Sequence, residues 1–261
     1  MILKGSVFSK VLGMDTGLSI VAPNSPSPAG EPRKVVYLLH GLCGSNSTWI
    51  DYSMLPAYAA GSNTVFILPE VARSFYTNMA HGFDYFRYIT EELPEICQSA
   101  FRISALPKDT AVMGGSMGGH GALKCALRCP DRYGMCGAFA ASPLFLKKGL
   151  DELRKNGMSE EFLSAFGNQL DRDFHSAFGD ELVWKAENDP SALMLQVPAE
   201  KKPRVFMACG EEDGFLEENK AFSSLLAQNG YDAAFKCLKG NHTFYFFNEA
   251  LQAALKHFEL I

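Results

Sequence analysis

The feature that most constrains this chain is a Gly-Gly-Ser-Met-Gly-Gly stretch centred on Ser116. It follows the apolar run 110–113, which predicts a buried strand, and it leads into residues 120–127, which predict a helix. Gly114, Ser116 and Gly118 match the pattern G-x-S-x-G, in which a sharp strand-to-helix turn presents a serine hydroxyl above a sheet. Side chains two positions before and after the serine would collide where the chain doubles back, so glycine is needed there. The stretch therefore predicts a turn that presents a nucleophilic serine.

Further apolar runs of strand length occur before and after this turn, and each ends in a small or turn-forming residue. Their unbroken hydrophobicity is typical of central strands that are covered on both faces. The runs are 34–39, 65–68, 136–141 and 204–209, with a last strand expected at 233–238. Helices are expected at 85–100, with a kink near Pro94, at 218–229 and at 246–258. Strands that alternate with helices predict an α/β fold with a mostly parallel central sheet and helices on both faces.

Two parts of the chain depart from this alternation. Residues 7–21 hold two short mixed runs that suit a leading antiparallel hairpin, and residues 23–32 form a loop rich in Pro, Ser and Gly. Residues 144–195 are helical in pattern and rich in Leu and Phe, with no run that predicts a strand. We expect this segment to be a helical cap over the carboxyl ends of the strands, where ligands bind in open α/β sheets. The whole chain, 1–261, is expected to form a single α/β-hydrolase domain.

The composition limits the classes of partner. With 24 basic and 29 acidic side chains the net charge is 24 − 29 = −5, and no basic block occurs, so neither nucleic acid nor an anionic membrane surface is expected as a partner. No run approaches the roughly 18 apolar residues of a membrane span, and the amino terminus lacks a signal-like apolar core. Seven cysteines without a C-x-x-C pair fit a reducing compartment. These features predict a cytoplasmic protein.

A nucleophilic serine needs a histidine as base and a carboxylate that orients this base. Of the six histidines, only His242 directly follows the last predicted strand, where a loop can bring its imidazole over the turn. The acid is expected after the strand before last, where Glu211, Glu212 and Asp213 compete. Asp213 is preferred because a tight turn after Gly210 would point it inward, whereas the two glutamates are expected to be solvated.

The tetrahedral oxyanion of acyl transfer needs fixed N–H donors. One is expected from Met117, the residue after the nucleophile, and the other from the loop that follows the strand at 34–39. Leu42 is the favoured donor in this loop, and Cys43 is its near rival. His40 is expected to fix the shape of the same loop rather than to act as a base.

With these residues placed, the chain from Val35 to the carboxyl terminus resembles the esterase D group of α/β-hydrolases and, within it, the bacterial tributyrin esterases. The segments that carry the resemblance are 37–42, 73–78, 92–94, 115–123 and 130–131, together with the loops of Asp213 and His242. Ser-Met-Gly-Gly followed by Gly-Ala-Leu is much more specific than the G-x-S-x-G pattern alone. Relatives of this group include S-formylglutathione hydrolases, feruloyl and acetyl-xylan esterases, and mycolyltransferases.

The resemblance implies a catalytic triad of Ser116, Asp213 and His242, with oxyanion donors at Leu42 and Met117. It also implies short-chain carboxylic esters as substrates.

The resemblance further implies that Tyr76 borders the active-site entrance. His81, in the loop before Asp84, is placed where it can line the pocket, and His40 belongs to the loop after the strand at 34–39. Tyr76, His40 and His81 are therefore the candidate substrate-binding residues. Packing of Tyr76 within its own loop is an equally open interpretation. Two features depart from the family pattern, in which the position after Gly114 is commonly Leu or Phe and tryptophans follow the histidine. This chain has Gly115 instead, and residues 243–247 contain no tryptophan. These changes affect the expected acyl or alcohol preference and leave the chemistry intact.

The predicted function is a serine carboxylesterase for short-chain acyl esters, such as acetyl, butyryl and tributyrin-like esters, and also sugar or hydroxycinnamoyl esters. The reaction needs no metal or cofactor. Alternatives are a thioesterase of the S-formylglutathione hydrolase type and an acyltransferase to a sugar alcohol. A noncatalytic binding protein is disfavoured because all three triad residues are present. The expected partner is a small-molecule ester, and exposed aromatic side chains on the cap would be compatible with a homodimer.

Overall fold

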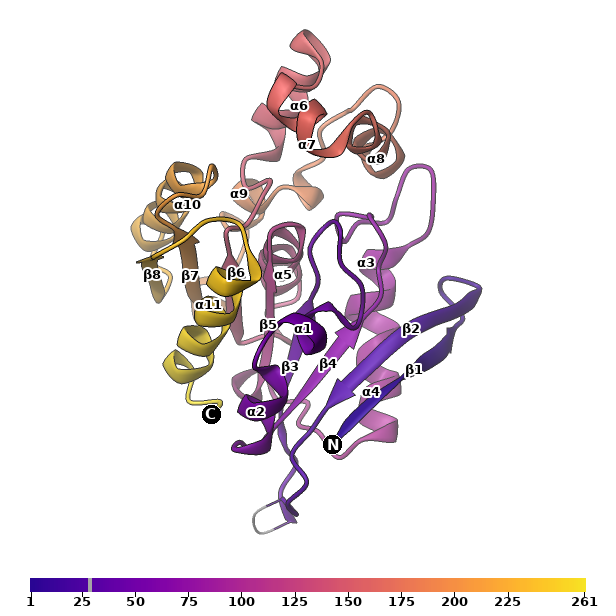
Figure 1. Cartoon of the computed structure of the whole chain (residues 1–261), viewed down its shortest axis with the longest axis vertical. Helices are drawn as coiled ribbons and strands as arrows, with labels where there is room; N and C mark the ends of the chain where they lie inside the picture. The colour runs from indigo at the N-terminus through magenta and orange to yellow at the C-terminus, as the bar shows by residue number, and fades with distance from the viewer. Residues whose placement is uncertain (28–29) are drawn as a thin grey trace.

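The strands of this protein form one twisted sheet, seen in Figure 1, in a computed structural model that describes residues 1–27 and 30–261. The strand order within these residues is β1-β2-β4-β3-β5-β6-β7-β8. The strands are β1 (Ile2–Ser9), β2 (Met14–Val21), β3 (Lys34–Leu39), β4 (Thr64–Pro69), β5 (Thr110–Gly115), β6 (Met135–Phe139), β7 (Arg204–Gly210) and β8 (Ala233–Leu238). The pairs β1–β2 and β2–β4 are antiparallel and all other neighbours are parallel, so the predicted mostly parallel sheet is confirmed.

The central strands are hydrophobic throughout because each supplies side chains to two cores. In β3, Val35, Tyr37 and Leu39 belong to one buried cluster, and Val36 and Leu38 belong to the other. All five side chains are buried. Successive side chains of a strand point to opposite faces of the sheet. An unbroken apolar run therefore packs against a helical layer on each face.

Helices cover both faces of the sheet. On one face pack α3 (Tyr85–Arg87), η2 (Tyr88–Glu92), α4 (Leu93–Ala100), α5 (Met117–Arg128) and α10 (Leu216–Gln228). On the other face pack α1 (Thr48–Tyr52), α2 (Leu55–Ala60) and α11 (Phe244–His257). The short helices η3 (Pro107–Asp109) and η5 (Ala199–Lys201) lie in connections. This arrangement is the α/β-hydrolase fold that the alternation of strands and helices predicts.

The segment between β6 and β7 is helical, as expected for residues 144–195. Its helices are α6 (Leu146–Asn156), α7 (Glu160–Phe166), α8 (Gln169–Phe178), η4 (Ala186–Asn188) and α9 (Pro190–Leu193). Figure 1 shows α6, α7 and α8 grouped above one end of the sheet, on the side where α5 begins. We call α6, α7 and α8 the cap.

Two elements differ from the prediction by more than a shift of two or three residues at their ends. The leading hairpin begins at Ile2 rather than at residue 7. The pairing of β1 with β2 runs from Ile2–Val21 to Ser9–Met14 and so covers the whole of β2. Ile2 and Leu3 are exposed, so no core-facing pattern marks this part of the strand. The helix expected at 85–100 is interrupted by the π-helical turn η2, and α4 restarts at Leu93 with Pro94 in its first turn. A proline is tolerated there because the first N–H groups of a helix have no intrahelical acceptor.

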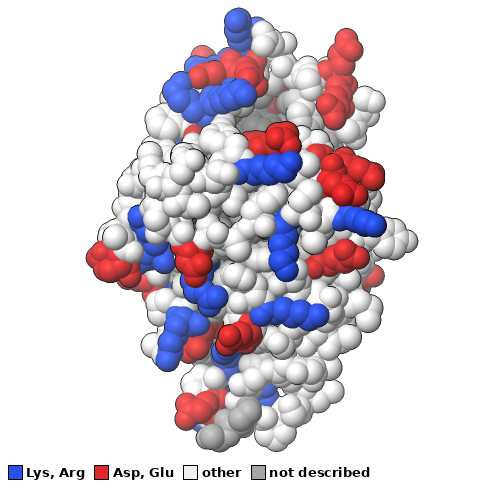
Figure 2. Space-filling view, turned by 90° about the vertical axis from the view of Figure 1, so that its left-hand side faces the viewer, with Lys and Arg blue, Asp and Glu red and all other residues white. Residues whose placement is uncertain are grey.

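The surface carries charges of both signs. Figure 2 shows basic and acidic side chains interspersed over the face in view, without a continuous basic field. In the described part of the chain, no helix has the length and apolar character that crossing a membrane requires.

Candidate active site

Ser116 lies in a strained turn between β5 and α5. Its φ is 57° and its ψ is −124°, a conformation that residues with a side chain rarely adopt. Its N–H donates to the carbonyl of Phe139 on β6 at 2.8 Å, which ties the turn to the neighbouring strand. A Cβ at Gly114 would lie 2.4 Å from the carbonyl oxygen of Gly118, and a Cβ at Gly118 would lie 2.4 Å from that of Leu39. Both glycines are therefore required by close backbone approaches.

Asp213 and His242 come together from the loops after β7 and β8. His242 Nδ1 lies 2.8 Å from Asp213 Oδ2, and Asp213 Oδ1 accepts a hydrogen bond from the N–H of Phe215 at 3.0 Å. The Asp213 side chain is 1% exposed and that of His242 is 36% exposed. The loops can approach because Gly210 has no side chain, since a Cβ there would lie 2.3 Å from the Gly240 carbonyl oxygen.

The two competing glutamates lie elsewhere. Glu211 and Glu212 are exposed, and their N–H groups donate to the carbonyls of Leu238 and Gly240, respectively. Their carboxylates therefore remain at the surface, as expected, while the shorter Asp213 turns inward.

The ring of Phe247 contacts both the imidazole of His242 and the turn that carries Ser116. His242 packs edge-on against Phe247 at a centroid distance of 5.0 Å. A Cβ at Gly115 would lie 2.8 Å from the Phe247 ring, so this ring also touches the residue before Ser116. Among the hydrogen bonds of the described residues, none joins Ser116 to His242. Such bonds are often long in the unliganded state and shorten when substrate binds.

The predicted oxyanion donors lie at the start of α5 and in the loop after β3. Met117 is buried at the first position of α5, and the Cβ position of Gly41 is 3.5 Å from Ser116 Cβ, which brings the loop of Leu42 against the nucleophile. Within the described residues, neither the N–H of Leu42 nor that of Met117 donates to a protein acceptor. Both amides are therefore free to bind an oxyanion.

Three successive carbonyl groups of this loop each face a side-chain nitrogen or hydroxyl. Trp49 Nε1 donates to the Leu39 carbonyl at 2.9 Å, and the Tyr76 hydroxyl donates to the His40 carbonyl at 2.8 Å. His40 Nδ1 lies 2.8 Å from the Gly41 carbonyl oxygen. These contacts hold three consecutive residues, at the end of β3 and the start of the loop.

The three candidate substrate-binding residues occupy different environments. The side chains of His40 and Tyr76 are buried behind the loop, at 1% and 0% exposure, so they support it and do not offer a surface to substrate. This placement differs from the expected contact with substrate and agrees with the alternative of loop packing. His81 is exposed and lies 3.1 Å from Asp180 after α8.

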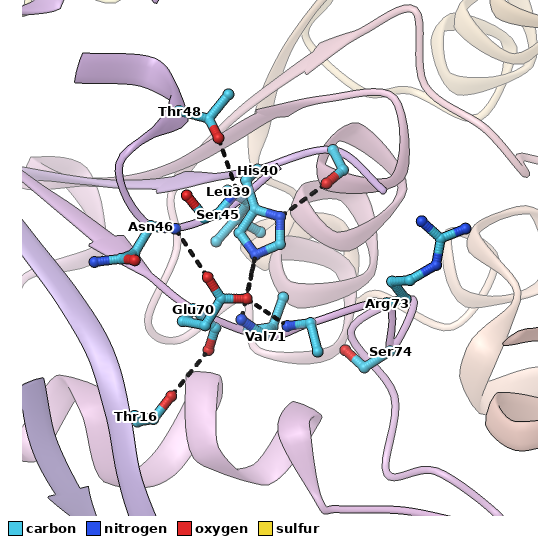
Figure 3. A network of polar contacts seen from close by, with 12 residues as sticks. Thr16, Leu39, His40, Ser45, Asn46, Thr48, Glu70, Val71, Arg73 and Ser74 are labelled. Carbon is cyan, nitrogen blue, oxygen red and sulfur yellow. Dashed lines mark hydrogen bonds and ion pairs between the residues drawn. The ribbon is translucent and has the colours of Figure 1, made fainter. Parts of the chain in front are cut away.

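Sequence reasoning did not single out Glu70, which lies beside His40 in Figure 3. Glu70 Oε1 is 3.4 Å from His40 Nε2, and the carboxylate also accepts hydrogen bonds from the N–H groups of Ala72 and Asn46. Burial raises the pKa of this carboxyl, but the hydrogen bond and charge of His40 and the two backbone N–H groups outweigh it, so the pKa is lowered overall. A signal was available, because Glu70 directly follows β4 at the functional edge of the sheet.

Arg73 is a second residue whose role emerges only from the structure. Its guanidinium binds the buried Asp173 of α8, with Nε and Nη2 each 2.7 Å from Oδ2. Its Nη1 donates to the Leu42 carbonyl at 3.3 Å. Arg73 therefore joins the cap to the loop that carries a predicted oxyanion donor.

Comparison with known proteins finds similar proteins along almost the whole chain. A family model described as "Putative esterase" matches residues 9–258. An acetyl esterase from Caldicellulosiruptor saccharolyticus is 26% identical over 98% of this chain and 97% of its own length. Two solved structures from Staphylococcus aureus are each 25% identical and cover 99% of this chain and 98% of theirs. They are the fluorophosphonate-binding serine hydrolase F, with a TM-score of 0.83, and an S-formylglutathione hydrolase, with a TM-score of 0.82.

The fold and the match along almost the whole chain define an α/β-hydrolase of the serine esterase class. The chain belongs to the esterase family that this model describes. The predicted fold and the prediction of an ester-hydrolysing enzyme are therefore confirmed.

Proposed function

We propose that this protein hydrolyses short-chain carboxylic esters through an acyl-enzyme on Ser116, with His242 as base and Asp213 as the orienting acid. The observation that carries the proposal is the 2.8 Å contact between His242 Nδ1 and the buried Asp213 carboxylate, beside the strained turn of Ser116. The free amides of Leu42 and Met117 support it, because an ester carbonyl needs two donors where its negative charge develops.

The reaction follows from these positions. His242 Nε2 takes the proton of Ser116 Oγ, which bonds to the ester carbonyl carbon, and the oxyanion binds the N–H groups of Leu42 and Met117. The tetrahedral intermediate expels the alcohol oxygen, which receives the proton from His242. Water then gives a proton to His242 and attacks the acyl group, and Ser116 leaves with that proton. Asp213 keeps the imidazole in the required tautomer and stabilises its charged form.

Hydrolysis of p-nitrophenyl esters from acetate to octanoate tests this proposal. Ser116→Ala should lower kcat by roughly 10⁵-fold or more on the preferred ester, as expected for loss of the nucleophile. Ser224→Ala, an exposed serine of α10, is the matched control and should retain the wild-type rate. A Ser116→Ala variant as active as wild type would contradict the proposal, and the chain-length profile would report the size of the acyl pocket.

A thioester is the second candidate substrate, favoured by the similarity to the S-formylglutathione hydrolase from Staphylococcus aureus. The same residues would serve, with a thiolate as leaving group. Comparing kcat/KM for S-formylglutathione with that for p-nitrophenyl acetate and butyrate separates the two. A value at least 100-fold higher for the thioester would assign the protein to thioester hydrolysis.

A further inference from the structure

One peptide group of the site is held at its carbonyl oxygen by two contacts, and its N–H group is a predicted oxyanion donor. The carbonyl of Gly41 and the N–H of Leu42 belong to the same planar unit, and in a trans peptide they point in opposite directions. The Gly41 carbonyl oxygen accepts a hydrogen bond from the N–H of Gly44 at 2.9 Å and lies 2.8 Å from His40 Nδ1. Fixing this carbonyl therefore fixes the direction of the Leu42 N–H.

The contact also determines where His40 carries its proton. A carbonyl oxygen can only accept, so His40 Nδ1 must be protonated to bind Gly41. The other ring nitrogen, Nε2, lies 3.2 Å from the N–H of Val71 and 3.4 Å from Glu70 Oε1. A neutral ring accepts from Val71, and a protonated ring donates to Glu70. The Nδ1–H group points at Gly41 in both states.

The surroundings of His40 hold its ring in place (Figure 3). The side chain is 1% exposed, so bulk water does not compete for Nδ1. The carboxylate of Glu70 is itself fixed by the N–H groups of Ala72, at 2.8 Å, and Asn46, at 3.1 Å. The backbone of Glu70 is tied to β2, because its N–H donates to the carbonyl of Gly17 at 2.9 Å. The ring of His40 is thus supported from two strands outside its own loop.

We propose that His40 is a positioning residue for ester hydrolysis, which aims the Leu42 N–H at the oxyanion through the Gly41 carbonyl, and that Glu70 holds the His40 ring. This inference rests on the proposed function. Trp49 and Tyr76 also donate to carbonyls of the loop, but those carbonyls belong to other peptide groups. Among the side chains of the described residues, only that of His40 forms a hydrogen bond with the peptide that supplies the donor, and the other contact with this peptide comes from the backbone N–H of Gly44.

Two substitutions of nearly equal polarity separate this role from a general contribution to folding. In His40→Asn the amide nitrogen can occupy the place of Nδ1 and donate to Gly41. In His40→Gln the amide reaches the place of Nε2 and leaves the Gly41 carbonyl without its side-chain donor. We expect kcat on p-nitrophenyl butyrate to fall roughly 10- to 100-fold in His40→Gln, somewhat less than the loss of a whole oxyanion donor, with KM changed less than about threefold. His40→Asn should retain kcat within about fivefold of wild type.

A trifluoromethyl ketone provides a second measurement that a purely structural role would not change. Ser116 Oγ adds to its carbonyl carbon, the serine proton passes to His242, and the resulting oxyanion occupies the same position as in the reaction. Its inhibition constant should weaken in His40→Gln by the same factor as kcat/KM. Equal losses in His40→Asn and His40→Gln, or a loss confined to thermal stability, would overturn the proposal.

The wild-type protein offers a test that does not depend on the folding of a variant. A two-bond ¹H–¹⁵N correlation spectrum of protein with ¹⁵N-labelled histidine reports which ring nitrogens are protonated. The proposal requires His40 to be protonated on Nδ1 at every pH at which the enzyme is active, and a ring protonated on Nε2 alone would overturn it.

Ser116→Ala, assayed in parallel, distinguishes the failure of this inference from the failure of the proposed function. If wild type and Ser116→Ala have equal rates, the proposed function fails and this inference fails with it. If only Ser116→Ala is inactive, the comparison of the two His40 variants decides the role of His40 alone.

Discussion

The loops at the carboxyl ends of the strands and the cap are stabilised in different ways. In the loops, His40 and Asp213 are buried and hydrogen-bonded, and the Ser116 turn is tied to a neighbouring strand through its N–H. In the cap, α7 has no buried residue, and α6 carries exposed ion pairs between side chains four residues apart. Such pairs contribute little to stability in water. The loops can therefore hold the proposed reacting atoms in a fixed geometry, whereas α7 of the cap packs on the core only through the partly buried Phe162 and Phe166.

Several contacts join α8 of the cap to the loop after β4. Arg73 binds the buried carboxylate of Asp173, and the ring of Phe75 packs against those of Phe174 and Phe178 at centroid distances of 4.8 and 5.6 Å. Both contacts reach α8 from a segment that also supports the loop of Leu42. We infer that changes in the strand-end loops affect the chemical step, and that changes in the cap affect binding and stability.

The largest loss of activity is expected from Asp213→Asn, in one of the strand-end loops. The amide can place a donor rather than an acceptor toward His242 Nδ1, so the imidazole loses its orientation and its stabilised charge. We expect kcat on p-nitrophenyl butyrate to fall roughly 10³- to 10⁴-fold with a small change in melting temperature. Glu212→Gln, at the exposed residue next to Asp213, is the control and should leave kcat within twofold of the wild-type value. A loss of activity in Glu212→Gln as large as that in Asp213→Asn would contradict the assigned acid.

An intermediate effect is expected from Asp173→Asn in the cap, where stability rather than kcat should decrease. The substitution weakens the charge-assisted hydrogen bonds from Arg73, so the free energy of unfolding should fall by about 1–3 kcal/mol. The kcat should change less than tenfold, and any loss of kcat/KM should come from KM. Urea unfolding and steady-state kinetics measure both quantities. Asp171→Asn, on the same helix and without this partner, is the control, and a hundredfold loss of kcat in Asp173→Asn would erase the contrast between cap and loops.

The effect that is smallest at neutral pH comes from His120 on α5, at the junction between the two regions, and it appears only as the pH falls. Burial, with a smaller contribution from the charge of Lys124, lowers the pKa of His120 to about 4, while its Nδ1 contacts the Pro143 carbonyl oxygen at 2.7 Å. The hydrogen bond to Pro143 and the charge of Asp189 act in the opposite direction. An unfolded histidine takes up its proton near pH 6.5, so between pH 6.5 and 4 the unfolded state binds more protons. Stability should therefore decrease as the pH falls through this window, by up to about 3 kcal/mol from this group.

The substitution His120→Asn tests this expectation. It removes the titrating ring but can keep a donor for Pro143, so the decrease of melting temperature from pH 6.5 to 4 should be smaller than in wild type. Parallel decreases in the two proteins would show that other groups cause the acid sensitivity.

Local patterns in the sequence were sufficient to predict the elements that carry the proposed catalytic residues. The glycines around Ser116 are dictated by backbone collisions within a few residues, and unbroken apolar runs mark strands that are buried on both faces. Asp213 and His242 could be chosen because each follows a predicted strand, and parallel strands end at one edge of a sheet. These inferences need only short-range sterics and periodicity, which neighbouring residues contain.

The tertiary structure alone decided which distant residues meet. Arg73 and Asp173 are 100 residues apart in the chain, and no local pattern pairs them. Likewise Gly115 and Phe247, both departures from the family pattern, are adjacent in space, and the ring fills the room that a side chain at position 115 would need. Such contacts depend on strand order, register and the path of connecting loops, which result from the packing of the whole chain. The proposed catalytic residues could thus be chosen from the sequence, whereas the groups that hold them in place became visible only in the folded protein.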